Sequence, residues 1–555
     1  MSKDFQYFFK SIKNYLAQNW KSLLLLFIIT LAIKVIYFLT HLNFSQDQVR
    51  DFIFIQNLID NHNFYIPLGP AAASYSNFNV PPLYYYFQLL AQLALKNYFY
   101  AMDVFIIILE SFSPLLLFYL IQQVLLQPKH VNSSSKVQLS TQHKKTLHYQ
   151  LSHKFYFSLP FLLSILYSFS PMLINNSTSA WNPNLIPFFT LLFLVFSLKF
   201  LLRDNNPSFL ISLLSFSILV NLHFQWFVLL PIFFIVAIKA LIKIKKVWPY
   251  ILIAIGIILA IFSPYLHHEL TTNFSNLQGA INFMIGKPEE PQFERIVFVK
   301  YLTLFYPGFY TRLFTNSLFI TDWAVLHNLQ HDQTPNAMIV SAIIFFIISF
   351  LAFIKILDQT FKKKNYWSLT ILIFFALMAL TLRVYKGDKP DYFLLVFSSF
   401  IFVFLALALD LIKNQIFQKS LLLSLFILEL ITLSKISFYD NYQSFQKIAN
   451  IISFYPAEQT QIIPLHQELQ VPLSLFFDKN RFYQSINPNS KYIFLICYQN
   501  QRCDNFWPQG SNETNFFNYN SSKKVDYSQY IPNYNPSLSY SMSTNGYIIN
   551  VITQN

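Results

Sequence analysis

The chain has 555 residues, of which 54% are hydrophobic and 12% are charged, and its formal net charge is +14. Soluble globular proteins average about 25% charged residues, so this composition excludes an ordinary soluble protein. The positive charge favours a membrane protein over a nucleic-acid-binding one, because Lys and Arg collect in the cytoplasmic loops of membrane proteins. With only eight glycines in the whole chain, a glycine-rich loop that would hold a nucleotide phosphate is not expected.

Apolar segments of about 20 residues, the length that crosses a bilayer, recur along the chain. The first follows Lys13 and Lys21; it is too long for a signal peptide and no small-residue cleavage site follows it. We therefore expect a retained anchor with its N-terminus in the cytoplasm. The complete pattern predicts eleven spans, at 22–40, 103–127, 154–171, 184–202, 208–222, 224–242, 248–264, 337–357, 366–384, 391–412 and 419–436.

The positions of the basic residues support this count. Clusters of Lys or Arg precede the first span and follow the second, fourth, sixth, eighth and tenth, so eleven alternating spans place all of them on one side. The positive-inside rule makes that side the cytoplasm. The apolar stretch 81–98 would invert every later loop if it crossed the membrane. We expect it to lie as a helix in the outer interface, where aromatic side chains such as Tyr85 are enriched.

Three regions are then predicted on the extracytoplasmic side. They are a first outer loop at 41–102, a long outer loop at 265–336, and a C-terminal domain at 437–555 that follows a transmembrane domain at 1–436. Stretches such as "KYIFLICYQN" predict a small α/β or mostly β fold for the C-terminal domain. Cys497 and Cys503 both lie there. An oxidising compartment permits a disulfide between them, and two buried thiols remain the alternative.

The segment "SQDQVRDF" (45–52) places three charges just after the first span. Ser45 suits a helix N-cap, and Asp47 would lie in the first turn, where the helix dipole favours a carboxylate. Arg50 and Asp51 are the i+3 and i+4 neighbours of Asp47 and share its helical face. The pattern predicts an amphipathic helix over 45–61, with Phe52, Ile53, Ile55 and Ile59 on its apolar face. Its charged face is either a solvated surface or part of a functional site.

Other polar residues are predicted on the same side of the membrane. Trp181 and Asn182 precede a helix start, with Asn182 as the cap before Pro183. A short turn carries His223 and Gln225. The remaining stretches are "SPYLHHEL" with Glu269, and an outer turn that contains Lys386, Asp391 and Tyr392. Adjacent histidines on a helix point apart, so we predict no metal site at His267 and His268. Glu110 and Glu429 lie inside predicted spans. We leave both outside the predicted site, because each could be a buried neutral carboxyl.

Together these stretches resemble a known family. "DQVRD", "IPLGP" (66–70), "PPLYYY" (81–86), "WNPN" (181–184), "LHFQ" (222–225), "SPYLHHEL" (263–270) and "DYF" (391–393) follow one another in the order expected of bacterial membrane glycosyltransferases of family 39. This family has the GT-C fold and is related to protein O-mannosyltransferases and to the aminoarabinose transferase of lipid A. The resemblance covers about residues 20–440. It departs at Asp391, where the family often has a His before the Tyr.

The resemblance implies an inverting transfer of a sugar from a polyprenyl-phosphate donor to a hydroxyl acceptor. Asp47 matches the family's base, which takes the acceptor's proton. Arg50, Lys386 and His223 would contact the donor phosphate, where cations stabilise the charge that develops. The resemblance implies supporting roles for Asp51, Gln225, Tyr85, Trp181, Asn182, Glu269, Asp391 and Tyr392. The residues leave the sugar, the acceptor and any need for a divalent cation open.

Two alternative functions use the same kind of lipid-linked substrate. A transporter or flippase of lipid-linked glycans would need polar residues at mid-membrane depth, with inverted repeats or broken helices. A polymerase or ligase of surface polysaccharide would share the donor chemistry and build longer chains. No internal repeat is evident in the sequence, which favours the glycosyltransferase.

Overall fold

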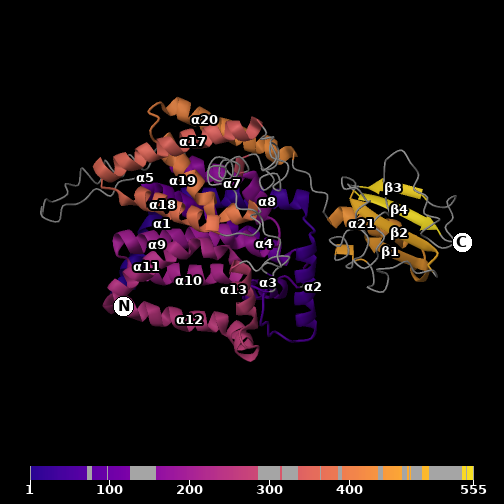
Figure 1. The fold of residues 1–555 in the computed structure, drawn as a ribbon. Coiled ribbons are helices and arrows are strands. Elements are labelled where there is room, and N and C mark those ends of the chain that lie inside the picture. The colour runs from indigo at the N-terminus through magenta and orange to yellow at the C-terminus, as the bar shows by residue number, and fades with distance from the viewer. Residues whose placement is uncertain are drawn as a thin grey trace. The chain divides into compact units, whose positions relative to one another are not determined.

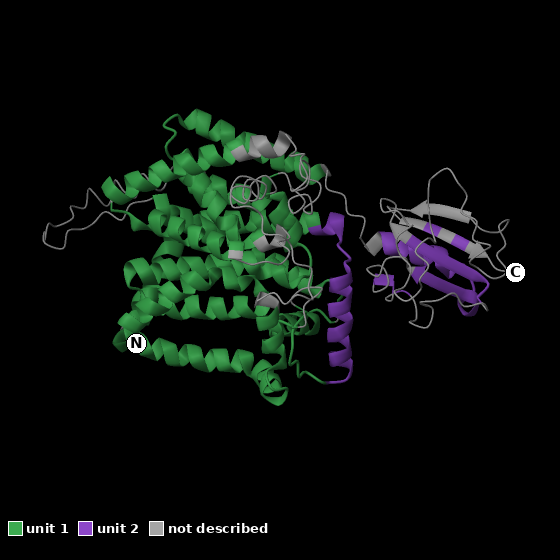
Figure 2. Cartoon of the chain, in the orientation of Figure 1, with its two compact units in different colours: residues 1–37, 63–436 green, residues 38–62, 437–555 purple. Residues whose placement is uncertain are grey.

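A computed structural model of the chain is mainly helical, with a small sheet near the C-terminus (Figure 1). The structure describes residues 2–71, 78–96, 98–125, 158–285, 313–314, 336–362, 364–384, 391–435, 442–464, 472–473, 476, 490–498, 540–544 and 547–553. Contacts divide the chain into two compact units, Met1–Tyr37 with Asn63–Ile436, and Phe38–His62 with Ser437–Asn555 (Figure 2). The end of the first predicted span (38–40) and the first part of the predicted outer loop (41–62) therefore group with the C-terminal residues.

Each of the eleven predicted spans coincides with a helical segment in the described residues. Eight helices there are long and apolar enough to cross a membrane, one further span is a bent pair, and Asn206–Leu222 and Leu394–Leu409 are shorter apolar helices. The polytopic helical fold is thus confirmed. The helices are α1 (Ser2–His41), α4 (Ala101–Glu110), α5 (Ser113–Leu125), α7 (Leu159–Phe169), α8 (Pro171–Ser177), α9 (Ile186–Arg203), α10 (Asn206–Leu222), α11 (Leu230–Ile242), α12 (Ile244–Thr271), α17 (Asn336–Leu357), α18 (Tyr366–Val384), α19 (Ser398–Leu409) and α20 (Gln415–Lys435).

Short tight turns extend several of these helices. Asn182–Leu185 (η2) leads into α9, Phe224–Leu229 (η3) leads into α11, and Asp391–Phe397 (η6) leads into α19. A π-helical turn, η5 (Asp358–Lys362), follows α17. The first unit also contains α3 (Leu83–Ala94) and α13 (Ser275–Ile285). With twelve residues, α3 is about 18 Å long, which is less than the bilayer core of about 30 Å.

Two predicted boundaries are wrong. The third span does not end at 171, because α8 continues it after a bend of 58°. Ser170, with φ −53° and ψ 117°, leaves the helical region just before Pro171, as the ring of a following proline favours. The seventh span does not end at 264, because α12 runs through Pro264 to Thr271.

A neighbouring hydroxyl helps α12 to continue past Pro264, the second of its two prolines. Pro264 has no N–H to donate to the carbonyl four residues earlier, which is that of Ala260. The Ser263 hydroxyl donates to the Ala260 carbonyl instead, at 2.9 Å. The residues His267 to Glu269 therefore lie on the last turns of a helix and the loop predicted at 265–336 begins later, with α13 inside it.

One end of the helices in the first unit is basic and is called the basic end below. Asp4, near the start of α1, accepts hydrogen bonds from Asn206 at the start of α10 (3.1 Å) and from Tyr250 in the second turn of α12 (3.2 Å). Asp204, just after α9, forms ion pairs with Lys239 (2.6 Å) and Lys243 (2.5 Å) at the end of α11. These contacts bring together the ends that the predicted alternation places on one side.

Further contacts extend the basic end to the later helices. Asn365, just before α18, donates to the Val124 carbonyl near the end of α5, at 2.9 Å. Lys355, near the end of α17, is paired with Asp410, just after α19, at 2.5 Å. The alternation of these helices therefore agrees with the charge pattern of the sequence.

The second unit consists of α2 (Gln46–Asp60), α21 (Tyr442–Ser453) and a four-stranded sheet of order β1-β2-β4-β3. The pair β1 (Thr460–Pro464) and β2 (Tyr492–Tyr498) is parallel, and β4 (Tyr547–Thr553) pairs antiparallel with β2 and with β3 (Tyr540–Thr544). Of the two predicted folds for the C-terminal domain, the α/β alternative is therefore observed. Cys503 lies outside the described residues, so the disulfide stays a prediction.

Candidate functional site

The helix predicted at 45–61 is observed as α2, with its charged residues at its N-terminus. Ser45 has extended backbone geometry and its hydroxyl accepts a hydrogen bond from the Gln48 N–H at 3.3 Å. This satisfies one of the backbone donors that a helix start leaves unpaired. Asp47 lies in the first turn, so its carboxylate has a favourable interaction with the helix dipole.

Arg50 bridges two carboxylates whose environments differ. Its NH1 lies 2.5 Å from Asp47 Oδ1, and its Nε and NH2 lie 2.8 and 2.7 Å from Asp51 Oδ1. The Asp51 side chain is 1% exposed, whereas those of Asp47 and Arg50 are 40% and 43% exposed. Asp51 therefore fixes the guanidinium from the buried side, and Asp47 remains accessible to a substrate.

The apolar side of α2 is only partly the predicted one. Val49, Phe52 and Ile55 are buried, whereas Ile53 and Ile59 are half-buried. Asp51 itself is buried with them. The three charges therefore do not form one solvated face. The guanidinium of Arg50 compensates the negative charge of the buried Asp51 carboxylate.

His223 and Gln225 lie in the first unit and are buried. His223 is the N-cap of η3, and its Nδ1 accepts a hydrogen bond from the Gln225 N–H at 3.3 Å. A neutral imidazole whose Nδ1 accepts can donate only through Nε2. The side-chain amide of Gln225 is fully buried, and neither of its polar atoms has a hydrogen-bond partner among the described residues.

Asn182 does not have the predicted capping role. Trp181 is the N-cap residue of η2 and caps it with no side-chain hydrogen bond, while Pro183 lies near the start of η2 as predicted. The Asn182 side-chain amide instead donates to the Leu222 carbonyl at 2.6 Å. Leu222 is the last residue of α10, where carbonyls lack partners within their own helix. Asn182 therefore joins the start of η2 to the end of α10.

Glu269 is buried and supports a neighbouring helix. Its Oε2 accepts a hydrogen bond from the Leu277 N–H at 3.3 Å, in the first turn of α13. His267 is exposed and its Nδ1 lies 2.8 Å from the Tyr65 hydroxyl. His267, His268 and Glu269 differ in burial because they point in different directions from α12. Within the described part of the chain, no group of three or more His, Cys, Asp or Glu residues is arranged to hold a metal ion.

The motifs "IPLGP" and "PPLYYY" meet in the first unit. The Gly69 N–H donates to the Val80 carbonyl at 2.8 Å, and the Val80 N–H donates to the Pro70 carbonyl at 3.0 Å. A Cβ atom at Gly69 would lie 2.5 Å from the Pro81 carbonyl oxygen, which explains why a glycine is needed at this close approach. Tyr85, on the following helix α3, is buried.

The last outer turn of the prediction is described only in part. Lys386 lies outside the described residues. The backbone of Asp391 and Tyr392 belongs to η6, and their side chains are not described. Any contact of these three residues with the other candidate residues stays a prediction.

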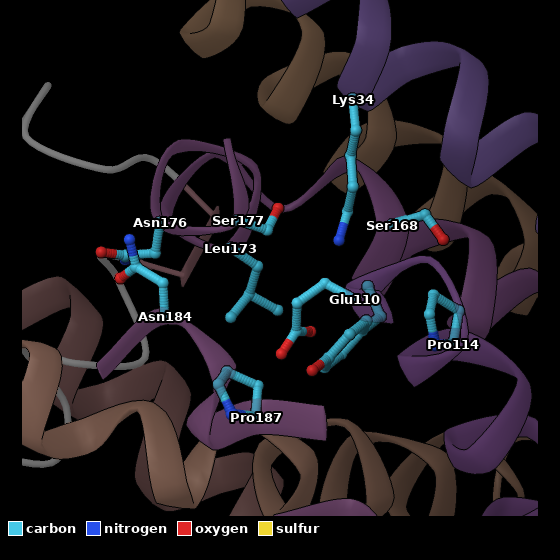
Figure 3. Close-up of a pocket in the computed structure, with 10 residues that line it drawn as sticks. Lys34, Glu110, Pro114, Ser168, Leu173, Asn176, Ser177, Asn184 and Pro187 are labelled. Atoms are coloured by element: carbon cyan, nitrogen blue, oxygen red, sulfur yellow. The ribbon is translucent and has the colours of Figure 1, made fainter. Parts of the chain in front are cut away.

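A second polar site, which the sequence analysis left out, lies inside the helices of the first unit (Figure 3). Lys34 of α1 and Glu110 of α4 are 3% and 2% exposed and line a cavity of about 10 Å³, measured as the space open to the centre of a water molecule. A single water needs about that volume. The other polar side chains that line it include Tyr167, Ser168, Asn176, Ser177 and Asn184.

Glu110 connects three helices at this cavity. Its Oε2 accepts from the Ser113 hydroxyl at 2.7 Å and its Oε1 accepts from the Phe188 N–H at 2.9 Å. Phe188 lies in the first turn of α9, so the carboxylate caps that helix. The Lys34 ammonium points toward Glu110 (Figure 3), and no direct ion pair within 4 Å is found for it among the described residues.

The signal for this site was present in the sequence. Glu110 is a carboxylate inside a predicted span, and Lys34 is a cation inside the first apolar span. Charged residues inside transmembrane helices are rare and are paired or functional when they occur. Their opposite signs could have suggested that they form a pair.

Comparisons with known proteins give the following matches. No protein-family model matches the chain, and no curated protein does so. Among solved structures, ArnT from Cupriavidus metallidurans bound to undecaprenyl phosphate aligns over 94% of this chain and 97% of its own, with a TM-score of 0.46 and 8% identity. The apo state of the same protein aligns over the same shares, with a TM-score of 0.40 and 9% identity.

Proposed function

We propose that this protein is an inverting glycosyltransferase of the GT-C type, similar to family 39. It would transfer a sugar from a polyprenyl-phosphate donor to a hydroxyl acceptor at the extracytoplasmic face of a bacterial inner membrane. The observation that carries the proposal is the arrangement at the start of α2, where Arg50 bridges a buried and an accessible carboxylate. The order of the sequence motifs supports the same chemistry.

Asp47 is proposed as the general base. Its side chain is 40% exposed, so an acceptor hydroxyl can reach the carboxylate. In the reaction the hydroxyl oxygen attacks the anomeric carbon and its proton passes to Asp47. The bond between the anomeric carbon and the phosphate oxygen breaks, and polyprenyl phosphate leaves with the bonding electrons. A single displacement of this kind inverts the anomeric centre.

Arg50 is proposed as a phosphate contact. A guanidinium has five N–H groups in a planar fork that suits a phosphate, and 43% of this side chain is exposed. The buried Asp51 holds the guanidinium through Nε and NH2. When the donor phosphate approaches, it would compete with Asp47 for the NH1 group of Arg50. Asp47 would then be released from Arg50 and could act as the base beside the anomeric carbon.

The other predicted residues keep roles as proposals. Lys386 would add positive charge near the phosphate, and His223 would add a hydrogen bond. His223 could contribute only through Nε2, since its Nδ1 already accepts from the Gln225 N–H. Tyr85, Trp181, Gln225, Glu269, Asp391 and Tyr392 would shape the surroundings of the donor.

The proposal is tested with purified protein, labelled polyprenyl-phosphate sugars and a panel of hydroxyl acceptors, with and without EDTA. Asp47→Asn keeps the shape of the side chain and removes its basicity, so we expect transfer to fall by about 10³-fold, within the range expected for loss of a general base. Asp60→Asn is the matched control, because Asp60 is an exposed carboxylate at the end of the same helix, and it should retain full activity. Unchanged transfer by a folded Asp47→Asn protein would exclude Asp47 as the base.

One observation favours the transporter alternative. Lys34 and Glu110 are charged residues buried among membrane-type helices, as a flippase of lipid-linked glycans would require. A fluorescent polyprenyl-phosphate sugar reconstituted in liposomes distinguishes the two functions. Movement of the lipid between leaflets without any acceptor would support transport, whereas formation of a glycosylated acceptor supports transfer. Product length on a gel separates a single transfer from polymerisation.

A further inference from the structure

Phe44 connects the helix of the proposed base to the C-terminal domain. Its ring is fully buried, and its centroid lies 5.3 Å from that of Phe445 and 6.0 Å from that of Phe476. Both partners belong to the C-terminal residues, and all three rings are within the second compact unit. Ring centroids at 4.5 to 7 Å with tilted planes are a favourable arrangement for aromatic side chains.

Phe44 occupies a position that controls the direction of α2. It immediately precedes the N-cap residue Ser45. An apolar side chain at this position packs in a way that fixes the angle at which the chain enters a helix. Asp47 follows three residues later in the first turn, and Arg50 one turn further. Phe44 therefore joins the start of α2 to the C-terminal residues of the second unit.

Phe445 is itself anchored in the fold of the C-terminal domain. It lies on α21 with Ile448, Ala449 and Ile452, all buried, at the i+3, i+4 and i+7 spacing of one helical face. A ring held in this way has little freedom to move. Phe44 therefore packs against a fixed part of the domain and not against a loose side chain.

We propose that the C-terminal domain is a positioning domain for the active site, and that Phe44 is the residue through which it acts on Asp47 and Arg50. This inference rests on the proposed function for the meaning of Asp47. It assigns the domain a role in orienting the base, beside any role in recognising the acceptor. Phe44 is a positioning residue in this account and contacts neither donor nor acceptor.

The test compares Phe44→Ala with a matched control on the same domain. Phe454, just after α21, is 87% exposed, so Phe454→Ala removes the same ring without removing this packing. In the full-length protein, hydrogen exchange of the amides at 46–52 should become at least tenfold faster in Phe44→Ala and remain unchanged in Phe454→Ala. Phe445→Ala should give the same local effect as Phe44→Ala, and the double variant should add little to either.

The catalytic measurement separates positioning from general loss of structure. We expect Phe44→Ala to lower kcat by about tenfold while the KM for the polyprenyl-phosphate sugar stays within twofold, and we expect Phe44→Leu to restore most of kcat. Equal exchange rates at 46–52 in wild type and Phe44→Ala would overturn the proposal. So would a Phe454→Ala protein as impaired as Phe44→Ala. If Phe44→Ala does not fold, Phe44→Leu and Phe445→Ala decide by the same two measurements.

Failure of this inference can be told from failure of the proposed function. If the wild-type protein transfers no sugar from any polyprenyl-phosphate donor, the proposed function fails. The exchange measurement needs no activity and still decides whether the domain holds α2. If wild type transfers sugar and Phe44→Ala matches it in both kcat and exchange, only the positioning role is lost.

Discussion

Asp47 and Asp51 have the same side chain and the same partner, but they differ in how deeply they are buried. Both contact Arg50, but Asp51 is 1% exposed and Asp47 is 40% exposed. A buried charge without its partner is costly, so Asp51 and Arg50 constrain one another strongly. Asp47 can exchange its contact with Arg50 for one with a substrate at lower cost, since ion pairs at exposed sites contribute little. The position of each carboxylate thus suits a different task.

This division predicts the effect of Asp51→Asn. The amide keeps the shape of the side chain and its oxygen can still accept from Arg50, but it removes the negative charge that attracts the guanidinium, so the orientation of Arg50 is less strongly fixed. We expect kcat to fall by about tenfold, equivalent to about 1.4 kcal/mol, with α2 still helical. Steady-state kinetics and hydrogen exchange of α2 check this. Activity equal to that of the wild type would show that Asp51 has no part in orienting Arg50.

Asp204 predicts a dependence of stability on pH. Hydrogen bonds from Lys239 and then Lys243 lower the pKa of Asp204 from 3.8 to about 2. A carboxyl with a lowered pKa stabilises the folded state above its unfolded pKa and loses this contribution as the pH falls through its folded value. Asp204→Asn should therefore lower the Tm slightly at pH 7, and the difference should shrink between about pH 4 and pH 2.

Thermal unfolding in detergent at several pH values measures this effect. Asn is a suitable replacement because Asp204 has a positive φ of 53°, a conformation that Asn tolerates well. The effect is expected to be small, since the Asp204 side chain is 61% exposed and screening weakens exposed ion pairs. A difference in Tm that stays constant down to pH 2 would contradict the ion-pair explanation.

At the scale of elements, Lys34 and Glu110 join α1, α4 and the start of α9. Glu110 accepts hydrogen bonds from Ser113 and from the Phe188 N–H, and Lys34 lies about 10 Å along α1 from its end at His41. Both charges are therefore well inside the helical unit. Their mutual neutralisation is what makes their burial tolerable.

We therefore predict that removing one charge harms more than removing both. Glu110→Ala leaves the Lys34 ammonium without compensation and the Phe188 N–H without an acceptor, and should destabilise the protein by about 3–5 kcal/mol. The double variant Lys34→Met/Glu110→Gln removes both charges and keeps an acceptor for Phe188, and should recover most of this loss. Thermal or chemical unfolding in detergent compares the variants, and a double variant less stable than Glu110→Ala would refute the pairing.

The elements also show where sequence reasoning succeeds and where it stops. Long apolar segments and capping residues predicted the spans and the start of α2 at Ser45, because those signals are local. The continuation of α12 through Pro264 depends on a hydroxyl bond from Ser263, which a proline rule cannot anticipate. The first residues of α1 are polar, and they are held by distant partners such as Tyr250, whose hydroxyl donates a hydrogen bond to Asp4.

At the scale of the whole molecule, charge alternation predicted the relative directions of the helices. Asp4, Arg203, Lys239 and Asn365 come from four separate helix ends and take part in the contacts of the basic end. The grouping of residues 38–62 with the C-terminal residues was not predicted. Contacts between two segments that are hundreds of residues apart produce no periodic pattern in the sequence of either segment.

The orientation of the chain in the membrane is a prediction of its own. The positive-inside rule places the basic end in the cytoplasm, so the C-terminal domain should be extracytoplasmic. Alkaline phosphatase fused after residue 555 should be active, and the same reporter fused after residue 413, beyond the tenth predicted span, should be inactive. Activity of the second fusion and inactivity of the first would invert the proposed topology.

The packing of Phe44 against Phe445 also has a consequence for the biosynthesis of the protein. The two residues are 445 − 44 = 401 positions apart in the chain, so α2 is made and exported long before its partner exists. A chain still under synthesis would already hold Asp47, Arg50 and nearly all of its transmembrane helices, yet its first loop would have no domain to pack against. In the proposed account, the full rate of sugar transfer would be reached only when the last segment has crossed the membrane and folded.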